Sequence, residues 1–197
     1  MKRFVTKQTV SLLLVTIVII GSISFLLQPQ EGVACTYDEG SLYSLTYADE
    51  NGNCQTLEQY KAPVVVINAW ASWCPFCVEE LPDLALLADE FPEVPVIAIN
   101  RGESSADAQD FLKTLTLSDK LHILFDPQDS FYRFIEGFGM PETVFVDEEG
   151  TVLFHKRGVM SLQEMRDTIL LLTKRSQPNG STKSRSLCLG GEGTCSI

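Results

Sequence analysis

Basic side chains and histidine are both scarce in this sequence. The 197 residues include 15 lysines and arginines against 26 aspartates and glutamates, for a net charge of −11. Without a basic surface the chain cannot displace counterions from phosphates, so nucleic acid is not an expected partner. The two histidines, His122 and His155, stand alone in segments with strand-like patterns, where packing in the core is their usual role. In contrast, 45% of the residues are hydrophobic, which excludes a disordered protein.

The N-terminal segment is built to enter a membrane. Three basic residues precede an uncharged run at 10–27 that is long enough to cross the hydrocarbon layer as a helix. Because positive charge stays in the cytoplasm, we expect the rest of the chain on the extracytoplasmic side. Residues 1–31 are therefore predicted to be a signal anchor or a signal peptide. The first leaves the protein in the cell membrane as a single-pass protein, and the second leaves it secreted.

The residues that follow this segment do not decide between a retained anchor and a cleaved signal peptide. Gly32, Val33 and Ala34 are small enough for a signal peptidase site, whereas the hydrophobic run is longer than that of a usual signal peptide, which favours an anchor. Lipid modification of Cys35 is a third, less favoured possibility, because Gly32 stands where an aliphatic residue is wanted.

The remaining chain divides into one domain and a tail. Residues 32–175 number 144, enough for a single well-buried domain, and residues 176–197 are rich in Ser, Gly and Thr, as a flexible tail would be. We predict strands on both sides of a turn at 49–53 and further strands and helices along the domain. The strands are 64–69, 94–100, 121–125, 143–146 and 151–155, and the helices are 75–91, one capped by Ser104 and Ser105, 129–138, and one from Ser161 to about Lys174.

This order, β-β-β-α-β-α-β-α-β-β-α, predicts an α/β fold. Its βαβ units imply parallel strands, and the late hairpin around 147–150 adds an antiparallel edge. The result is a central mixed sheet flanked by helices, with an N-terminal β-hairpin as an extension. Pro82 is expected to kink the helix that contains it.

Six cysteines occur at positions 35, 54, 74, 77, 188 and 195. Cys74-Pro75-Phe76-Cys77 lies where a predicted buried strand meets a predicted helix, so unpaired N–H groups and the helix dipole would stabilise a Cys74 thiolate. Two intervening residues let both sulfurs meet in the first helical turn, which suits reversible thiol–disulfide exchange. A zinc site is disfavoured because no second C-x-x-C or H-x-x-x-H exists, and a purely structural disulfide is the other alternative.

Two motifs resemble a known family. The stretch from Asn68 to Cys77, followed by Glu80 and Pro82, is similar to the membrane-anchored, TlpA-like branch of the thioredoxin superfamily, which includes the thiol–disulfide proteins of cytochrome c maturation. About 65 residues later, Gly139-Met140-Pro141-Glu142-Thr143 resembles the loop that carries the cis-proline in that branch. The resemblance implies a thioredoxin fold over nearly all of residues 40–175.

The resemblance also implies roles for the cysteines and the proline loop. Cys74 would be the nucleophile and Cys77 the resolving cysteine. Pro141 would be a cis-proline that leaves the backbone of Met140 available to an extended substrate. Taken alone, this proline would be an ordinary residue at the start of a strand.

Other residues near the motif have implied roles with plainer alternatives. Trp73 would shield the disulfide and Trp70 would pack beneath it, or both are simple core aromatics. Pro75 and Phe76 would tune the redox potential and contact the substrate. Glu80 would take the proton of Cys77, its alternative being a solvated carboxylate.

Asn68 departs from thioredoxin, where a buried aspartate occupies the matching position. An amide cannot accept the proton of the resolving thiol, so that work would fall to Glu80.

The other cysteines are candidates for structural disulfides. Cys35 and Cys54 flank the N-terminal hairpin, and Cys188 and Cys195 could close a small loop in the tail. Exchange of the tail cysteines with Cys74 or with another chain is a further possibility.

The function predicted from these features is thiol–disulfide exchange outside the cytoplasm, with protein disulfides reduced and a membrane electron donor recycling the enzyme. No cofactor site and no metal site are visible in the sequence. One alternative is a peptide-binding module with an inert disulfide. The other is a thiol peroxidase, against which Ala71 stands where peroxiredoxins place a threonine to bind peroxide.

Overall fold

The computed structural model describes residues 19, 35 and 41–176 of the chain. The chain divides by its internal contacts into two units, Met1–Ala34 and Cys35–Ile197. The predicted membrane helix at 10–27 lies outside the described residues apart from Ile19, and the predicted tail lies outside them apart from Ser176. Within the described part, no helix combines the length and the hydrophobicity needed to cross a bilayer.

A seven-stranded mixed sheet forms the centre of the second unit. Its strands lie in the order β2-β1-β5-β4-β3-β6-β7. They are β1 (Thr46–Ala48), β2 (Cys54–Thr56), β3 (Val65–Trp70), β4 (Val96–Arg101), β5 (His122–Asp126), β6 (Glu142–Val146) and β7 (Val152–Arg157). The three middle strands β3, β4 and β5 are parallel, and β6 and β7 add an antiparallel hairpin beside β3. The predicted parallel core and antiparallel edge are confirmed. The N-terminal hairpin joins the opposite edge, antiparallel to β5.

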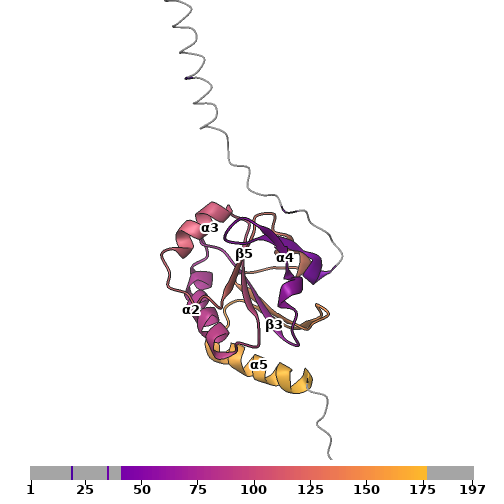
Figure 1. Cartoon of the computed structure of the whole chain (residues 1–197). Helices are drawn as coiled ribbons and strands as arrows, with labels where there is room; N and C mark the ends of the chain where they lie inside the picture. The colour runs from indigo at the N-terminus through magenta and orange to yellow at the C-terminus, as the bar shows by residue number, and fades with distance from the viewer. Residues whose placement is uncertain (1–18, 20–34, 36–40, 177–197) are drawn as a thin grey trace, which may run out of the picture. The chain divides into compact units, whose positions relative to one another are not determined.

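Helices cover both faces of this sheet (Figure 1). The helices are α2 (Pro75–Glu90), α3 (Ser105–Leu112), α4 (Ser130–Phe134) and α5 (Leu162–Ser176), with two 3₁₀ turns at Leu42–Ser44 and Leu57–Tyr60. One core contains buried side chains of α2, α3 and α5 with Val66 and Trp70 of β3. The other core places α4 and the two 3₁₀ turns against Val65 and Ile67 on the opposite face. Each face of β3 is therefore covered, as its continuous apolar run predicts.

The central position of β3 determines where the chemistry can lie. All six residues of the strand are buried, and it pairs with β4 on one side and β6 on the other. Four residues separate the end of β3 from the start of α2, so the Cys74–Cys77 motif sits at the carboxyl end of this interior strand. In open α/β sheets this is where ligands and substrates are usually bound.

The short helix α4 ends earlier than predicted, at Phe134 instead of position 138. Glu136 adopts a left-handed backbone conformation with φ of 51°, and the amide of Gly137 bonds back to the carbonyl of Tyr132, which closes the helix. A Cβ atom on Gly137 would lie 2.4 Å from the Tyr132 ring, so this close approach requires glycine. The early ending leaves residues 135–141 as the loop that leads into β6.

The two 3₁₀ turns were not predicted from the sequence, because three or four residues are too few for a periodic signal. Ser41 and Ser44 cap the first turn through reciprocal side-chain contacts. The ends of the predicted strands lie within two residues of the observed ones.

Candidate active site

The Cys74–Cys77 pair occupies the first turn of α2. Cys74 is the N-cap residue of the helix, and Pro75 fills its first position, where a missing N–H group does no harm. The two sulfurs form a disulfide, with 5.3 Å between the Cα atoms. The backbone N–H of Cys77 points at Cys74 Sγ, with 3.2 Å between nitrogen and sulfur. When the bond is reduced, this N–H and the helix dipole favour a thiolate on Cys74.

The two cysteines differ in access. Cys74 is 5% exposed and Cys77 is 1% exposed, so Cys74 is the sulfur nearer to solvent. This difference matches an outer nucleophile and an inner resolving cysteine.

Glu80 is a buried carboxyl group one helical turn beyond Cys77. Residues three apart lie on the same face of a helix, so Glu80 and Cys77 lie on the same side of α2. Glu80 Oε1 accepts a hydrogen bond from the backbone N–H of Met160 at 2.8 Å, and Oε2 accepts one from Asn68 Nδ2 at 3.2 Å. Burial raises the pKa of Glu80 to about 7, against the opposing effect of these two hydrogen bonds. The plainer alternative, a solvated carboxylate, is excluded by its burial.

Asn68 connects Glu80 to β6. Besides its bond to Glu80, the Asn68 amide donates to Thr143 Oγ1 at 2.9 Å across the β3–β6 pair. The side chain thus orients the Glu80 carboxyl group, a role that the sequence did not indicate.

The loop before β6 lies at the same end of the sheet as the cysteines. The Met140–Pro141 peptide bond is cis. Glu142, the next residue, pairs with Ala69 near the end of β3, which places Pro141 level with the start of the active-site loop. Met140 packs against the core cluster that contains Cys74 and Cys77. The two motifs noted in the sequence are therefore brought together.

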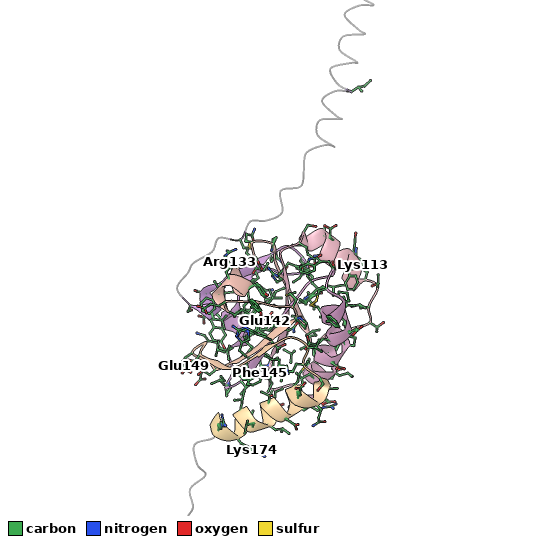
Figure 2. The ribbon with its side chains drawn as sticks, turned by 180° about the vertical axis from the view of Figure 1, so that it is seen from behind. Lys113, Arg133, Glu142, Phe145, Glu149 and Lys174 are labelled. Atoms are coloured by element: carbon green, nitrogen blue, oxygen red, sulfur yellow. A yellow bond between two sulfur atoms is a disulfide. The ribbon has the colours of Figure 1, made fainter. Side chains whose placement is uncertain are left out.

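Glu142 was missed as a site residue, although it lies within the motif that carries Pro141. Its side chain is fully buried, and it lies on the same strand as Phe145, as Figure 2 shows. Oε1 accepts the backbone N–H groups of Phe138 and Gly139 at 2.5 and 2.7 Å, and Oε2 lies 2.6 Å from His155 Nε2. A charged residue directly before the predicted strand 143–146, within the motif of Pro141, was the signal that could have found it.

These contacts decide the charge of the Glu142 carboxyl group. Burial alone would raise the pKa of Glu142, but the N–H groups of Gly139 and Phe138, together with His155, lower it below its ordinary value. Tyr132 Oη also donates to the carbonyl of Gly139, so the loop is held by both its N–H and its C=O groups. A charged Glu142 thus fixes the loop that precedes Pro141.

Three exposed aromatic side chains come from the two loops near the cysteines and from the first turn of α2. Trp73 and Phe76 are each 59% exposed, and Phe138 is 90% exposed. Trp70, in contrast, is fully buried and packs at an angle against Phe111, with 6.3 Å between ring centres. Trp70 therefore lies in the core that also contains both cysteines, whereas Trp73, Phe76 and Phe138 present apolar surface to solvent. Pro75 is also exposed.

A second disulfide lies in the N-terminal hairpin region. Cys35 and Cys54 are joined, with 5.6 Å between their Cα atoms, which ties the chain before the first 3₁₀ turn to the start of β2. Cys188 and Cys195 lie outside the described residues.

In the part of the chain that the structure describes, neither a cluster of metal ligands nor the cavity beside the N-terminal hairpin coincides with the cysteines. Among the described residues, no three His, Cys, Asp or Glu side chains gather as metal ligands would. A cavity of about 480 Å³ lies between the hairpin turn, the end of α3 and the start of β5, where the Tyr60 ring packs at an angle against His122. None of the residues of the Cys74–Cys77 motif lines this cavity.

Known proteins resemble more than half of the chain. The thiol-disulfide oxidoreductase ResA of Halalkalibacterium halodurans is 27% identical over 129 residues, which cover 63% of this chain and 70% of ResA. The thiol:disulfide interchange protein DsbE of Allochromatium vinosum is 33% identical over 118 residues, covering 58% of this chain and 62% of DsbE.

Solved structures show the same fold. A putative thiol:disulfide interchange protein DsbE from Chlorobium tepidum superposes with a TM-score of 0.60 at 23% identity, covering 70% of this chain and 99% of that one. The pneumococcal exposed lipoprotein thioredoxin Etrx1 from Streptococcus pneumoniae gives a TM-score of 0.59 at 26% identity, covering 66% and 98%. The thioredoxin-like fold and the resemblance to thiol–disulfide oxidoreductases are thus confirmed. The profile of the Redoxin family matches residues 34–169, and the chain belongs to that family.

Proposed function

We propose that the protein is an extracytoplasmic thiol–disulfide oxidoreductase that reduces disulfides of other proteins. The observation that carries the proposal is the Cys74–Cys77 pair at the start of α2, with the buried carboxyl group of Glu80 one turn beyond it. The relatives named above, ResA and DsbE, support the same class of reaction.

The reaction begins with the reduced pair. The Cys74 thiolate attacks one sulfur of a substrate disulfide, which forms a bond between Cys74 and the substrate and releases the other substrate sulfur as a thiolate that takes a proton from water. The exposed rims of Trp73 and Phe76 and the backbone of Met140 would hold the substrate chain during this step.

Resolution requires a thiolate on Cys77. Glu80 accepts the Cys77 proton, because a carboxyl group with a pKa of about 7 is partly ionised at neutral pH and can take a proton in this range. The Cys77 thiolate then attacks Cys74 Sγ, forms the intramolecular disulfide and expels the second substrate sulfur as a thiolate, which takes up a proton. Two electrons have passed from the enzyme dithiol to the substrate, and a dithiol protein of the membrane would restore the enzyme.

The proposed extracytoplasmic location is supported by the sequence of the N-terminus and by the Cys35–Cys54 disulfide. Residues 1–31 would act as a signal anchor or a signal peptide, with residues 32–175 as the working domain and residues 176–197 as a tail. The Cys35–Cys54 disulfide suits an oxidising compartment. The Streptococcus pneumoniae relative is an exposed lipoprotein.

The mechanism is tested by measuring thiol–disulfide exchange between the reduced protein and a peptide that contains a disulfide. The Cys74→Ala variant should lose exchange, and Cys77→Ala should accumulate a mixed disulfide that mass spectrometry locates on Cys74. The double variant Cys35→Ser, Cys54→Ser is the matched control and should retain exchange. Full turnover by Cys74→Ala would refute the mechanism.

The direction of the reaction needs a separate measurement. Equilibration of the Cys74–Cys77 pair with glutathione gives its potential, which we expect near the value of about −270 mV that is typical of thioredoxin. A potential near that of the periplasmic oxidant, about −120 mV, would exclude a reductant.

A further inference from the structure

A hydrogen-bonded clamp holds the loop that precedes the nucleophile. Glu103 Oε1 accepts the backbone N–H of Ser72 at 2.7 Å, and Glu103 Oε2 accepts the Ser72 hydroxyl at 2.5 Å. Asn100 Nδ2 donates to the same Oε1 at 2.5 Å. We call Asn100, Glu103 and Ser72 the loop clamp. One carboxyl group thereby satisfies three donors, two of which belong to a single residue of the active-site loop.

Glu103, which supplies the carboxylate of the loop clamp, lies between the end of β4 and the start of α3. Asn100 is fully buried near the end of β4 and lies opposite Trp70 of β3. Gly102 turns the chain with φ of 65°, and its N–H bonds to the carbonyl of Asp126 at the end of β5. Ser104 then caps α3. Glu103 is thus fixed between a strand end and a helix start.

The loop end of the clamp is a tight turn. The N–H of Cys74 bonds to the carbonyl of Ala71 at 3.2 Å, so Ser72 and Trp73 are the central residues of this turn. Fixing the N–H and the hydroxyl of Ser72 therefore fixes the direction in which the chain enters Cys74. That direction decides whether Cys74 Sγ faces the N–H of Cys77 at the start of α2.

From this geometry we infer that Glu103 is a positioning residue for the nucleophile. The inference rests on the proposed function only in taking Cys74 as the attacking sulfur. Through Ser72, Glu103 keeps the reduced Cys74 at the N-terminus of α2, where the helix stabilises the thiolate. No direct contact between Glu103 and either sulfur is involved.

A direct effect of charge would have the opposite sign. A carboxylate near a thiolate disfavours its ionisation, so removing the Glu103 charge alone would lower the pKa of Cys74. Removing the clamp lets the turn relax and takes Cys74 away from the helix N–H, which raises the pKa of Cys74. The sign of the change separates the two roles.

The experiment measures the pH dependence of alkylation of reduced Cys74 by iodoacetamide, with the modified cysteine identified by mass spectrometry. We expect Glu103→Ala to move the profile to higher pH and to lower the rate at pH 7 roughly 2- to 5-fold, the size of a typical helix-terminus effect. Ser72→Ala, which keeps the backbone N–H contact, should give a smaller loss in the same direction. Ser72→Thr keeps the hydroxyl and should match the unmodified protein.

Glu90→Gln is the charge control, because Glu90 pairs with Arg166 and lies at the far end of α2. It should leave the profile unchanged. Faster alkylation of Glu103→Ala, or an unchanged profile in both Glu103→Ala and Ser72→Ala, would overturn the inference. These outcomes do not depend on turnover, so the proposed exchange reaction can fail in the Cys74→Ala test while the clamp is still judged by alkylation.

Discussion

Replacing Glu80 by glutamine should remove a pH dependence of stability that the native protein carries. In the folded protein burial raises the pKa of Glu80 from 4.5 to about 7. Between these values the folded state keeps a proton that the unfolded state has lost, so unfolding releases a proton and a rise in pH favours the unfolded state. Glu80 therefore makes its least favourable contribution to the free energy of unfolding above pH 7, because there the folded protein must bury the charged carboxylate.

The size of the effect follows from the difference in pKa. At about 1.4 kcal/mol per pKa unit, the oxidised protein should lose about 2 to 3 kcal/mol of unfolding free energy from Glu80 alone between pH 5 and pH 8. Glutamine has no proton to lose and can still accept the Met160 N–H. The loss should thus be absent in Glu80→Gln.

Urea unfolding of the oxidised unmodified protein and of oxidised Glu80→Gln at pH 5, 6, 7 and 8 gives the free energy of unfolding of each. The difference between these two free energies removes the contribution of the other titrating groups, which both proteins share. A difference that stays constant over this range would refute a buried Glu80 with a raised pKa.

The same variant should also slow the resolution step, seen as a longer-lived mixed disulfide at Cys74. Normal resolution would show that Glu80 does not take the Cys77 proton.

Three further perturbations have defined outcomes. The double variant Cys35→Ser, Cys54→Ser should lose about 3 kcal/mol of stability, because the disulfide closes a loop with a sequence separation of 19. Phe138→Ala should change stability by less than about 0.5 kcal/mol, since the side chain is 90% exposed, while raising the KM for a peptide disulfide. Glu142→Gln should lose about 1 kcal/mol at pH 7 and less at pH 3, because a lowered pKa stabilises the fold only while the group is ionised.

Thermal and urea unfolding check the stabilities, and steady-state exchange checks KM. An unchanged melting temperature in the double cysteine variant would mean that this disulfide contributes nothing. An unchanged KM in Phe138→Ala would remove that ring from the substrate surface. A larger effect of Glu142→Gln at pH 3 than at pH 7 would contradict an ionised Glu142.

The main secondary-structure elements and the cysteine motif could be predicted from the sequence. The apolar run of β3 and the helical spacing of α2 are continuous local signals, so both elements were found to within one residue at each end. The Cys74–Cys77 motif was identified because its spacing and its place between strand and helix carry the chemistry together. Local patterns of this kind need no knowledge of the three-dimensional contacts.

The supporting contacts could not be predicted in the same way. Glu103 and Ser72 are 31 residues apart, and Asn68 and Thr143 are 75 apart. Nothing in the local pattern around Glu103 distinguishes it from the exposed carboxylates of an acidic chain. The helix α4 was overestimated because the backbone turn at Glu136 depends on Tyr132 packing over Gly137.

The bond from Met160 to Glu80 links the chemistry to the order in which the chain is made. Glu80 is synthesised 80 residues before its partner, and β6 and β7 must be added beside β3 before the loop at Met160 can cover the carboxyl group. A nascent chain that ends before this loop has the cysteine pair but lacks the Met160 N–H group that bonds to Glu80 Oε1. The complete hydrogen bonding of Glu80, the proton acceptor that we propose for Cys77, therefore arises only when synthesis has passed Met160.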